Sequence, residues 1–308
     1  MKILVTGGAG FIGSHIVDAY IAEGHDVVVF DNLATGNISN VNPQARLVVG
    51  DITTETLDAL MDDEQFDVVN HHAAHMELRV SLIKPLYDAS TNILGSIRLL
   101  EAARRTKVKH LILASSLAVI GNLEVFPADE THPQQPISPY GISKHSMEQY
   151  ARLYRNTHQM SITCFRYTTV FGPRQNPHGE SGVVAIFLQK FLKGAKATIH
   201  GDGNQTRDYI YIDDIVTANT IALQLQPNDT FFISTETEVS VNDIVSMLQE
   251  DLSVECVAVN GPDMPGDPRR TICSSARFTA LTGWAPRTSV REGVATTAAW
   301  FSSQVHTH

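Results

Sequence analysis

The chain has 308 residues, which fits one large α/β domain or two unequal ones. Apolar residues make up 43% of the sequence and acidic residues outnumber basic ones by 33 to 23, so we expect a sizeable core and no basic face for nucleic acid. Three cysteines without CxxC spacing argue against a disulfide framework or a zinc site and favour a reducing cytoplasm, and no apolar run approaches membrane-spanning length.

Short β-branched runs alternate with helical patterns through the first half of the chain. The first run begins at Lys2 and leads straight into a glycine-rich turn, so we expect no signal peptide. This βαβα alternation predicts an α/β fold, a Rossmann-type doubly wound parallel sheet with helices on both faces. Strands are expected at residues 3–6, 27–31, 46–49, 68–71, 110–114 and 161–166, and helices at 12–23, 87–105 and 141–157.

The alternation breaks after Phe171, where residues 172–177 are typical of turns. We predict a Rossmann domain over residues 1–171 and a smaller mixed α/β C-terminal substrate domain over residues 172–308, with some later strands returning to the large sheet. In this second part, strands are expected at residues 198–200, 209–212 and 231–234, and helices at 183–192, 213–225 and 241–249.

A dinucleotide-binding turn is predicted at residues 6–13, between the first strand and the first helix. Gly7, Gly10 and Gly13 let the turn close, let the backbone approach a pyrophosphate and let the helix pack on the strand. The helix N-terminus offers N–H groups and a positive dipole end to the phosphates. An ordinary tight turn can carry the same glycines, but the acidic residue that ends the second strand favours the dinucleotide interpretation.

Two carboxylates follow the second and third strands. Asp31 lies 18 residues after Gly13, where a carboxylate can bind the adenosine ribose hydroxyls and repel a 2′-phosphate, so NAD is favoured over NADP. Asp51 can hydrogen-bond the adenine amine, cap the following helix, or do both.

A catalytic pair is predicted where a helix starts after Pro139. The i, i+4 spacing puts Tyr140 and Lys144 on one face of that helix. A phenol with its ordinary pKa of about 10 is a poor base, and a neighbouring ammonium and a positive nicotinamide ring would both lower that pKa. Ser115 and Ser116 end the preceding strand, where a hydroxyl can relay a proton to Tyr140 or simply cap a turn.

Together these residues resemble the extended short-chain dehydrogenases, most closely the sugar-nucleotide epimerases and dehydratases of UDP-glucose 4-epimerase type. The resemblance extends over nearly the whole chain. It is carried by residues 5–14, 31–33, 71–74, 92–103, 115–121, 140–144, 166–177, 201–214 and 265–270.

The resemblance implies a role for each matching residue. Ser116 is the proton-relay hydroxyl, Tyr140 the base and Lys144 the anchor of the nicotinamide ribose. Arg207 corresponds to an arginine that grips the nucleotide diphosphate, a task that suits its bidentate geometry. The implied NAD-binding residues are Gly7, Gly10, Phe11, Ile12, Gly13, Asp31, Asn32, Thr35, Gly36, Asp51, Ile52, Ala73, Ala74, Asn92, Tyr140 and Lys144, and the implied substrate-binding residues are Ser116, Thr169, Val183, Arg207, Tyr209, Asp267 and Arg269.

Four positions differ from the family's usual pattern or from some of its branches. Leu117 and Ala118 stand where the dehydratases and decarboxylases carry acidic residues, so the remaining groups support an epimerase or a 4-dehydrogenase. Thr169 replaces the usual substrate asparagine, as in UDP-glucuronate 4-epimerases, and Met264 replaces a phosphate-binding arginine unless Arg269 or Arg270 takes over. The last change weakens the assignment of the nucleotide.

A histidine cluster at the end of the fourth strand is not expected to bind a metal. His71 and His72 point to opposite faces of a strand, and the enzymes that the chain resembles need no metal.

We therefore expect NAD-dependent C4 epimerisation of a nucleotide-diphosphate sugar, UDP-hexose by resemblance, through a transient 4-keto intermediate. The alternatives are an epimerase or net oxidoreductase acting on another nucleotide sugar such as a UDP-uronic acid, in secondary metabolism or cell-surface glycan synthesis, and an inactive NAD-sensing protein. The resemblance also implies a homodimer that packs through helices 87–105 and 141–157.

Overall fold

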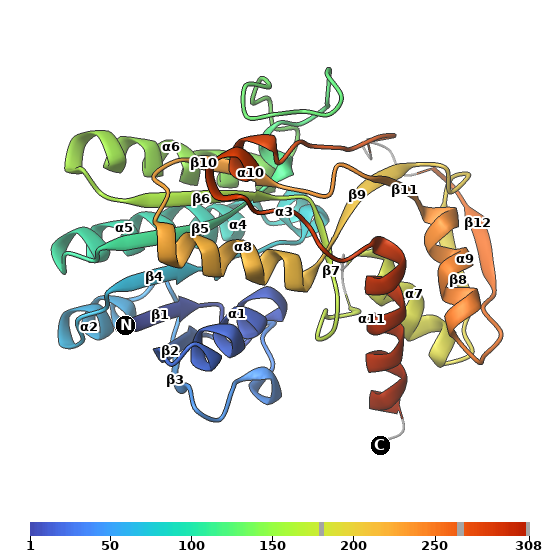
Figure 1. Ribbon diagram of the computed structural model, residues 1–308, viewed down its shortest axis with the longest axis horizontal. Helices are drawn as coiled ribbons and strands as arrows, with labels where there is room; N and C mark the ends of the chain where they lie inside the picture. Colours follow the sequence, from blue (N-terminus) through green and yellow to red (C-terminus); the bar gives the residue numbers. More distant parts are fainter. Residues whose placement is uncertain (179–181, 264–267, 306–308) are drawn as a thin grey trace.

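A seven-stranded, wholly parallel sheet forms the larger part of the molecule (Figure 1), and the computed structural model describes residues 1–178, 182–263 and 268–305. The strand order β10-β6-β5-β4-β1-β2-β3 reverses direction beside β1, which confirms the expected doubly wound Rossmann-type fold. The strands are β1 (Lys2–Thr6), β2 (Asp26–Asp31), β3 (Arg46–Val49), β4 (Val68–His71), β5 (His110–Ser116), β6 (Ile162–Tyr167) and β10 (Thr230–Ile233).

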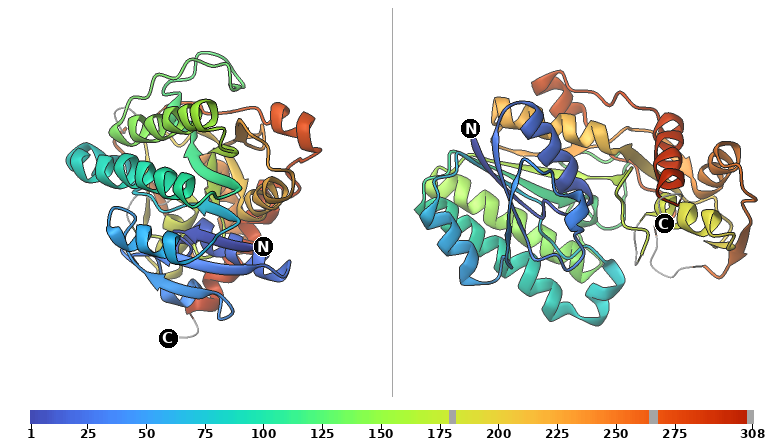
Figure 2. Two further views of the ribbon diagram at one scale, coloured as in Figure 1. Left: turned by 90° about the vertical axis from the view of Figure 1, so that its left-hand side faces the viewer. Right: turned by 90° about the horizontal axis from the view of Figure 1, so that it is seen from below.

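Helices cover both faces of this sheet (Figure 2). On one face α1 (Phe11–Ala22) packs beside α8 (Ile212–Leu225), and their apolar residues share a core with β1 and β2. On the other face α2 (Glu55–Asp63), α5 (Ser96–Arg105) and α6 (Pro139–His158) enclose a second core. Since both faces are covered, the strands are apolar almost throughout, as parallel sheets require.

The rest of the chain forms a smaller region beyond the carboxyl ends of the strands, on the right of Figure 1. It holds a three-stranded sheet, a two-stranded parallel sheet and three longer helices, whose apolar side chains continue the core around α1 and α8. These elements are β7 (Thr169–Phe171), β8 (Ala197–His200), β9 (Thr206–Tyr211), β11 (Glu238–Ser240), β12 (Ala258–Gly261), α7 (Val183–Leu192), α9 (Val241–Asp251) and α11 (Val290–Val305).

Strand β10 and helix α8 belong to the layers of the large sheet although they come late in the chain. β10 pairs in parallel with β6, Phe231 lying opposite Phe165, and α8 packs against α1. The large sheet is therefore built from both halves of the sequence, and a domain boundary at residue 171 stays a prediction.

The helical stretch expected at residues 87–105 is confirmed, but it is not one continuous α-helix. The structure has α4 (Pro85–Ala89), a π-helical turn η2 (Ser90–Gly95) and then α5. Within η2 the Asn92 side chain turns inward and pairs with the backbone of His75, accepting from its N–H at 2.8 Å and donating to its C=O at 2.8 Å. Such π-turns commonly mark functional sites, and here the turn brings a polar side chain toward the end of β4. The remaining short helices are η1 (Ile38–Asn40), α3 (Leu78–Ile83), η3 (Leu117–Val119) and α10 (Ala276–Thr282).

All three cysteines, Cys164, Cys256 and Cys273, are buried free thiols. None of the helices in the described ranges combines the length and the apolar character that crossing a bilayer requires.

Buried histidines lie within the large sheet. His71 hydrogen-bonds Thr6 Oγ1 at 2.7 Å and Ser96 Oγ at 3.1 Å, and His110 lies 3.0 Å from Thr163 Oγ1. Burial lowers the pKa of His71 and of His72 to about 3 and that of His110 to about 4, from an ordinary 6.5. All three imidazoles are therefore neutral in the folded protein at neutral pH.

We predict that the protein loses stability steeply in mild acid. Below about pH 6.5 the unfolded chain binds protons at these histidines and the folded chain does not, so the free energy of unfolding falls by about 1.4 kcal/mol per pH unit for each histidine. Burial raises the pKa of Asp208 to about 6, so between about pH 6 and the ordinary pKa of an aspartate the folded chain binds a proton that the unfolded chain does not. Over that range, Asp208 offsets the loss of stability caused by one of the three histidines. Urea unfolding measured from about pH 7 to about pH 5 checks this, and His71→Asn should reduce the slope. A flat profile would contradict it.

Candidate active site

The start of α6 places Tyr140 and Lys144 on the face that meets strand β5. Ser138 caps the helix by accepting a hydrogen bond from Gly141 N at 3.1 Å, and Pro139 occupies the first turn. A Cβ on Gly141 would lie 2.5 Å from Ala118 O, so only glycine lets the helix approach the segment after β5 this closely. This contact fixes where the two side chains of the first turns point.

Ser116, Tyr140 and Lys144 converge at the carboxyl end of β5. The Ser116 hydroxyl lies near enough to the Tyr140 phenol to lower its pKa, and Ser116 Oγ accepts from Ala118 N at 3.2 Å. Lys144 Nζ donates to Ala114 O at 2.8 Å. The three residues expected from the sequence to act together are thus neighbours, at the edge of the sheet where doubly wound folds bind their ligands.

Burial dominates the electrostatics of this pair. It raises the pKa of Tyr140 to about 12, against a smaller lowering by the Ser116 hydrogen bond, and it lowers the pKa of Lys144 to about 8. The sequence suggested a phenol with a lowered pKa. In the protein alone the desolvation of the phenolate outweighs any help from the ammonium, so Tyr140 is protonated at neutral pH.

A buried ion pair lies two turns along the same helix face and was not found from the sequence. Glu148 accepts from Arg166 Nη2 at 2.7 Å and from Arg166 Nε at 2.9 Å, and both side chains are almost fully buried. Ser115 Oγ donates to Glu148 at 2.6 Å. The pair therefore ties α6 to both β5 and β6. The i, i+4 step from Lys144 to Glu148 was the only signal in the sequence that could have indicated it.

The glycine turn is closed by backbone contacts that a side chain would prevent. Gly7 has a left-handed φ of 71°, and a Cβ there would lie 2.6 Å from Ala73 N. A Cβ on Gly13 would lie 2.3 Å from Gly7 O. Gly10 begins α1 without a side-chain cap, so the first N–H groups of this helix are open to an anion. Phe11 and Ile12, next along the helix, are half-buried.

Asp31 lies beside this turn with its carboxylate bound by backbone. Its two oxygens accept from Ala9 N at 3.0 Å and from Leu33 N at 2.8 Å. A Cβ on Gly36 would lie 2.9 Å from Asp31 Oδ1, and Thr35 beside it is exposed. The carboxylate therefore faces a narrow space between the ends of β1 and β2.

The segment after β3 carries the other residues expected to face an adenine. Asp51 accepts from Asn32 Nδ2 at 2.8 Å and from Thr53 N at 2.8 Å, so it holds the turn before α2. Ile52 is buried, and a Cβ on Gly95 would lie 2.7 Å from its side chain. The N-cap of α2 is Thr54, so Asp51 stabilises the turn before this helix and does not cap it, while its role toward an adenine stays a prediction.

The loop after β4 brings Ala73, Ala74 and Asn92 together at the mouth of the glycine turn. Thr6 Oγ1 accepts from Ala73 N at 3.3 Å. The Asn92 side-chain amide hydrogen-bonds the loop backbone, Asp88 Oδ1 at 3.0 Å and Ser143 Oγ at 3.1 Å. Asn92 therefore fixes the backbone of this loop through its hydrogen bonds to His75.

The expected substrate residues are less tightly grouped. Thr169 and Tyr209 lie opposite each other on the paired strands β7 and β9, and Val183 begins α7. Arg207 lies on β9, with Nη1 donating to Thr206 O at 2.8 Å. Arg269 is exposed and forms a bidentate pair with Asp202, with both N···O distances 2.7 Å. Asp267 and Met264 lie outside the described residues.

The histidines after β4 face different partners. His71 bonds Thr6 and Ser96, whereas His72 stacks on Tyr167 with ring centroids 5.9 Å apart. Over residues 1–178, 182–263 and 268–305, no three His, Cys, Asp or Glu side chains gather as metal ligands would.

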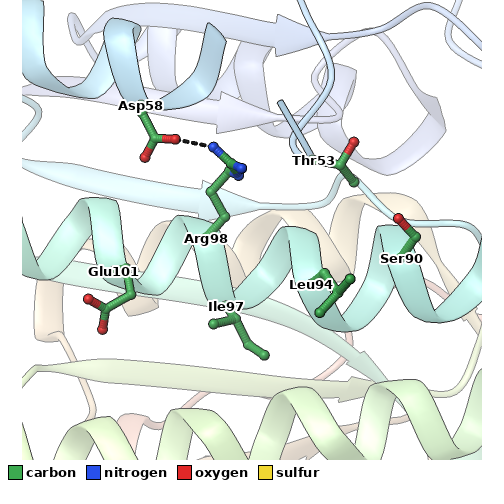
Figure 3. A pocket seen from close by; sticks show the side chains of 7 residues that line it. All are labelled: Thr53, Asp58, Ser90, Leu94, Ile97, Arg98 and Glu101. Atoms are coloured by element: carbon green, nitrogen blue, oxygen red, sulfur yellow. Dashed lines mark hydrogen bonds and ion pairs between the residues drawn. The ribbon is translucent and has the colours of Figure 1, made fainter. Parts of the chain in front are cut away.

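A surface cavity of about 460 Å³ lies away from these residues, between α2 and the η2–α5 segment (Figure 3). Arg98 and Asp58 pair across it. None of its lining residues belongs to the Ser116–Tyr140–Lys144 group, so this cavity is not part of the candidate active site.

Comparison with known proteins agrees with this geometry. A UDP-glucose 4-epimerase of Mycolicibacterium smegmatis is 36% identical over 318 residues, which cover 99% of each chain. The crystal structure of a Thermotoga maritima UDP-glucose 4-epimerase with UDP-glucose has a TM-score of 0.96 and 40% identity, covering 99% of this chain and 100% of that one. The Thermus thermophilus UDP-glucose 4-epimerase in complex with NAD has a TM-score of 0.93 and 35% identity, covering 98% of this chain and 99% of that one.

Residues 3–233 match the NAD dependent epimerase/dehydratase family. That span contains the glycine turn, Asp31, Ser116, Tyr140 and Lys144, and the likeness to relatives extends over the rest of the chain. The resemblance inferred from these motifs is therefore confirmed, and with it the use of NAD. The chain belongs to the NAD-dependent epimerase/dehydratase family, as an enzyme of the UDP-glucose 4-epimerase type.

Proposed function

We propose that this chain interconverts the C4 epimers of a nucleotide-diphosphate hexose of the UDP-glucose and UDP-galactose type. The proposal rests on the convergence of Ser116, Tyr140 and Lys144 at the carboxyl end of β5, in a chain whose full-length relatives include UDP-glucose 4-epimerases. When bound, NAD supplies the acceptor from which the hydride taken from C4 can be returned to either face of the sugar.

The proposed proton chemistry uses two hydroxyls and one ammonium. Tyr140 takes the proton of the C4 hydroxyl, directly or through Ser116, and gives it back when the sugar is reduced again. Lys144, one turn away, binds the nicotinamide ribose and favours the phenolate by its charge. The phenol that burial keeps protonated thus becomes a base only within the loaded site.

The groups around the glycine turn fit NAD. The uncapped α1 N-terminus suits a pyrophosphate, and the space against Gly7 and Gly13 admits backbone but no side chain. Asp31 suits ribose hydroxyls and disfavours a 2′-phosphate. We propose that Asn32, Thr35, Gly36, Asp51 and Ile52 border the adenosine half and that Ala73, Ala74 and Asn92 border the nicotinamide half.

The sugar and its nucleotide are proposed from fewer contacts. Arg207 is the candidate for the diphosphate and Thr169 with Tyr209 for the hexose, and Val183 and Arg269 are further candidates from the second region. Asp267 stays a candidate from the sequence alone. Arg269 would first have to leave Asp202. Leu117 and Ala118 follow Ser116 without a carboxylate, which disfavours the elimination of water.

A panel of UDP-, GDP-, dTDP- and CDP-sugars, read for both epimer formation and net NADH, would identify the substrate. We expect epimers of a UDP-hexose without accumulation of NADH. Net accumulation of NADH with a UDP-uronic acid would instead identify the protein as an oxidoreductase. Binding of NAD without turnover of any sugar would favour an NAD-sensing protein.

A second copy of this chain is the proposed partner. Large apolar side chains are exposed on α3, α4, η2 and α6, which lie side by side outside the sheet (Figure 2). A two-fold interface is self-complementary, so one such face can cover its copy. This apolar face includes Ile83 (77% exposed), Leu86 (86%), Leu94 (61%) and Ile142 (50%).

The three free thiols suit a reducing compartment, and we propose a cytoplasmic location.

Tyr140→Phe should lower kcat for epimer formation by at least about 100-fold while NAD stays bound, because the variant keeps the ring and loses the proton-carrying oxygen. Epimers are quantified by chromatography, and bound NAD is quantified after denaturing the purified protein. Tyr150→Phe, on the exposed side of the same helix, is the matched control and should retain turnover. Turnover by Tyr140→Phe close to that of the wild type would sink the proposed role of Tyr140.

Gly13→Ala should weaken NAD binding by at least about 100-fold, because the new methyl group would lie 2.3 Å from Gly7 O and would force the turn open. Titration calorimetry with NAD measures this change in Kd. Gly24→Ala is the control: it faces open space at the end of α1, and although its φ of 81° costs some stability, the affinity for NAD should hold. Equal affinity in both variants would contradict the proposed site.

Leu86→Asp should convert the dimer into a monomer at micromolar concentration, because a charge would be placed in the centre of a buried apolar contact. Light scattering coupled to size-exclusion chromatography gives the mass directly. Leu225→Asp, at an exposed position (58%) at the end of α8 on the other face of the sheet, should leave the mass unchanged. If the wild-type protein has the mass of a monomer, the proposed homodimer is wrong.

A further inference from the structure

Lys144 is a buried cation, with only 4% of its surface exposed. An ammonium that has lost its water tends to give up its proton, and burial is the main cause that lowers the pKa of Lys144 to about 8. No carboxylate of the described residues forms an ion pair with it, and Nζ donates to the backbone of Ala114. Its positive charge must therefore be stabilised by electrostatic attraction to charged groups on the surrounding helices and strands, without direct contact.

Six titratable side chains surround Lys144, and most of them carry no charge at neutral pH. On α6 and β6, Tyr140 and Cys164 have pKa values raised by burial to about 12 and about 11. At the end of β4 and just after it, burial lowers the pKa of His71 and of His72 to about 3, so both are neutral. The two that remain are the carboxylates of Glu148 on α6 and Asp88 on α4.

These two carboxylates differ in their own partners. Glu148 is gripped by the Arg166 guanidinium through Nε and Nη2, so the pair together has no net charge. The negative charge of Glu148 is therefore largely cancelled where it reaches Lys144. Within the described part of the chain, Asp88 forms no comparable bidentate ion pair with a guanidinium, and its negative charge interacts electrostatically with both Lys144 and Tyr140.

Asp88 is held in place by a chain of hydrogen bonds that ends on the catalytic turn of α6. It is 1% exposed, and its Oδ1 accepts from Asn92 Nδ2 at 3.0 Å and lies 3.3 Å from His75 Nδ1. Asn92 Nδ2 also lies 3.1 Å from Ser143 Oγ, which donates to Tyr140 O at 2.9 Å.

The second carboxylate oxygen, Asp88 Oδ2, is buried without a hydrogen-bond partner. A buried carboxylate oxygen without a donor is costly unless a nearby positive charge compensates it. His75, the titratable side chain that touches Asp88, reaches only Oδ1, whereas Lys144 is a buried ammonium that interacts electrostatically with the carboxylate. The need is mutual, since among the described residues Lys144 has no carboxylate in an ion pair with it and Asp88 Oδ2 has no donor.

We propose that Asp88 is the counter-charge of Lys144, a positioning residue that keeps the lysine protonated in its buried site. The consequence for catalysis rests on the proposed function: a charged Lys144 can bind the nicotinamide ribose and favour the Tyr140 phenolate, and a neutral one does neither well. The π-turn η2 has a role in this arrangement, because it directs Asn92 between Asp88 and Ser143.

The protonation of Lys144 can be followed directly in carbon-13 lysine-labelled protein, whose Cε resonances report titration and are assigned by comparison with Lys144→Met. In Asp88→Asn the titration midpoint of Lys144 should fall by about one pH unit. Asp63→Asn removes the same charge from the exposed end of α2 and should leave the midpoint where it is. An unchanged midpoint in Asp88→Asn would overturn the proposal.

Epimerase activity gives a second readout. The alkaline limb of kcat in Asp88→Asn should move to lower pH by the same amount, so that activity drops about 10-fold above the wild-type midpoint and approaches the wild type in mild acid. A uniform loss at all pH values, with no displacement of the limb, would contradict the counter-charge and indicate a packing role only.

A thermodynamic cycle covers the case in which Asp88→Asn folds poorly. In Lys144→Met the Asp88 charge has lost its partner, so adding Asp88→Asn should then raise the unfolding midpoint, whereas it lowers the midpoint of the wild type. The same loss in both backgrounds would overturn the proposal. The titration and the cycle need no substrate, so a chain that fails to epimerise any sugar would remove the proposed function and leave this test intact.

Discussion

The geometry of the candidate active site depends on one buried contact, the ion pair between Glu148 and Arg166. It joins the middle of α6 to β6 and, through Ser115, to β5. Breaking a pair of this kind leaves an uncompensated charge in the interior, at a cost of about 3–5 kcal/mol. Because the cost falls on any displacement of α6, the helix can meet the sheet in only one register, and Tyr140 and Lys144 then lie beside Ser116.

Around this contact the protein separates its charges into compensated groups. Arg166 neutralises Glu148, and Asp88 faces Lys144 across the α4–α6 contact, while the histidines, the phenol and the thiol nearby are uncharged. In a medium of low polarity an uncompensated charge would shift every neighbouring pKa. The arrangement leaves the Tyr140–Lys144 pair as the place where a bound ligand can most readily change a protonation state.

Much of the fold could be predicted, because its signals are local. Alternating apolar runs predicted six strands of the large sheet to within one or two residues at each end. The Tyr140–Lys144 spacing was sufficient to place both side chains on the face of α6 that meets β5. The interruption at Ser90–Gly95 was missed because it has no local cause in the sequence. It depends on the loop after β4, which Asn92 reaches only in the folded chain.

The glycine turn was predictable for the same reason. Glycines 7, 10 and 13 act within one turn, whereas Asp88, Glu148 and Arg166 act through partners from other elements, and no periodic pattern marks them. For Arg269 the sequence suggested a phosphate, and the folded chain pairs its guanidinium with Asp202, which the sequence did not indicate. The substrate half therefore stays a set of predictions.

The Asp31 carboxylate has a consequence for anyone who wishes to change the coenzyme preference of this protein. The oxygens that we propose to disfavour a 2′-phosphate also accept hydrogen bonds from Ala9 in the glycine turn and from Leu33 in the following loop. Replacing Asp31 by a neutral or basic residue would remove the repulsion and, at the same time, loosen the cradle itself. A successful redesign would have to supply a new acceptor for those two N–H groups, so nucleotide selectivity here is inseparable from the shape of the turn.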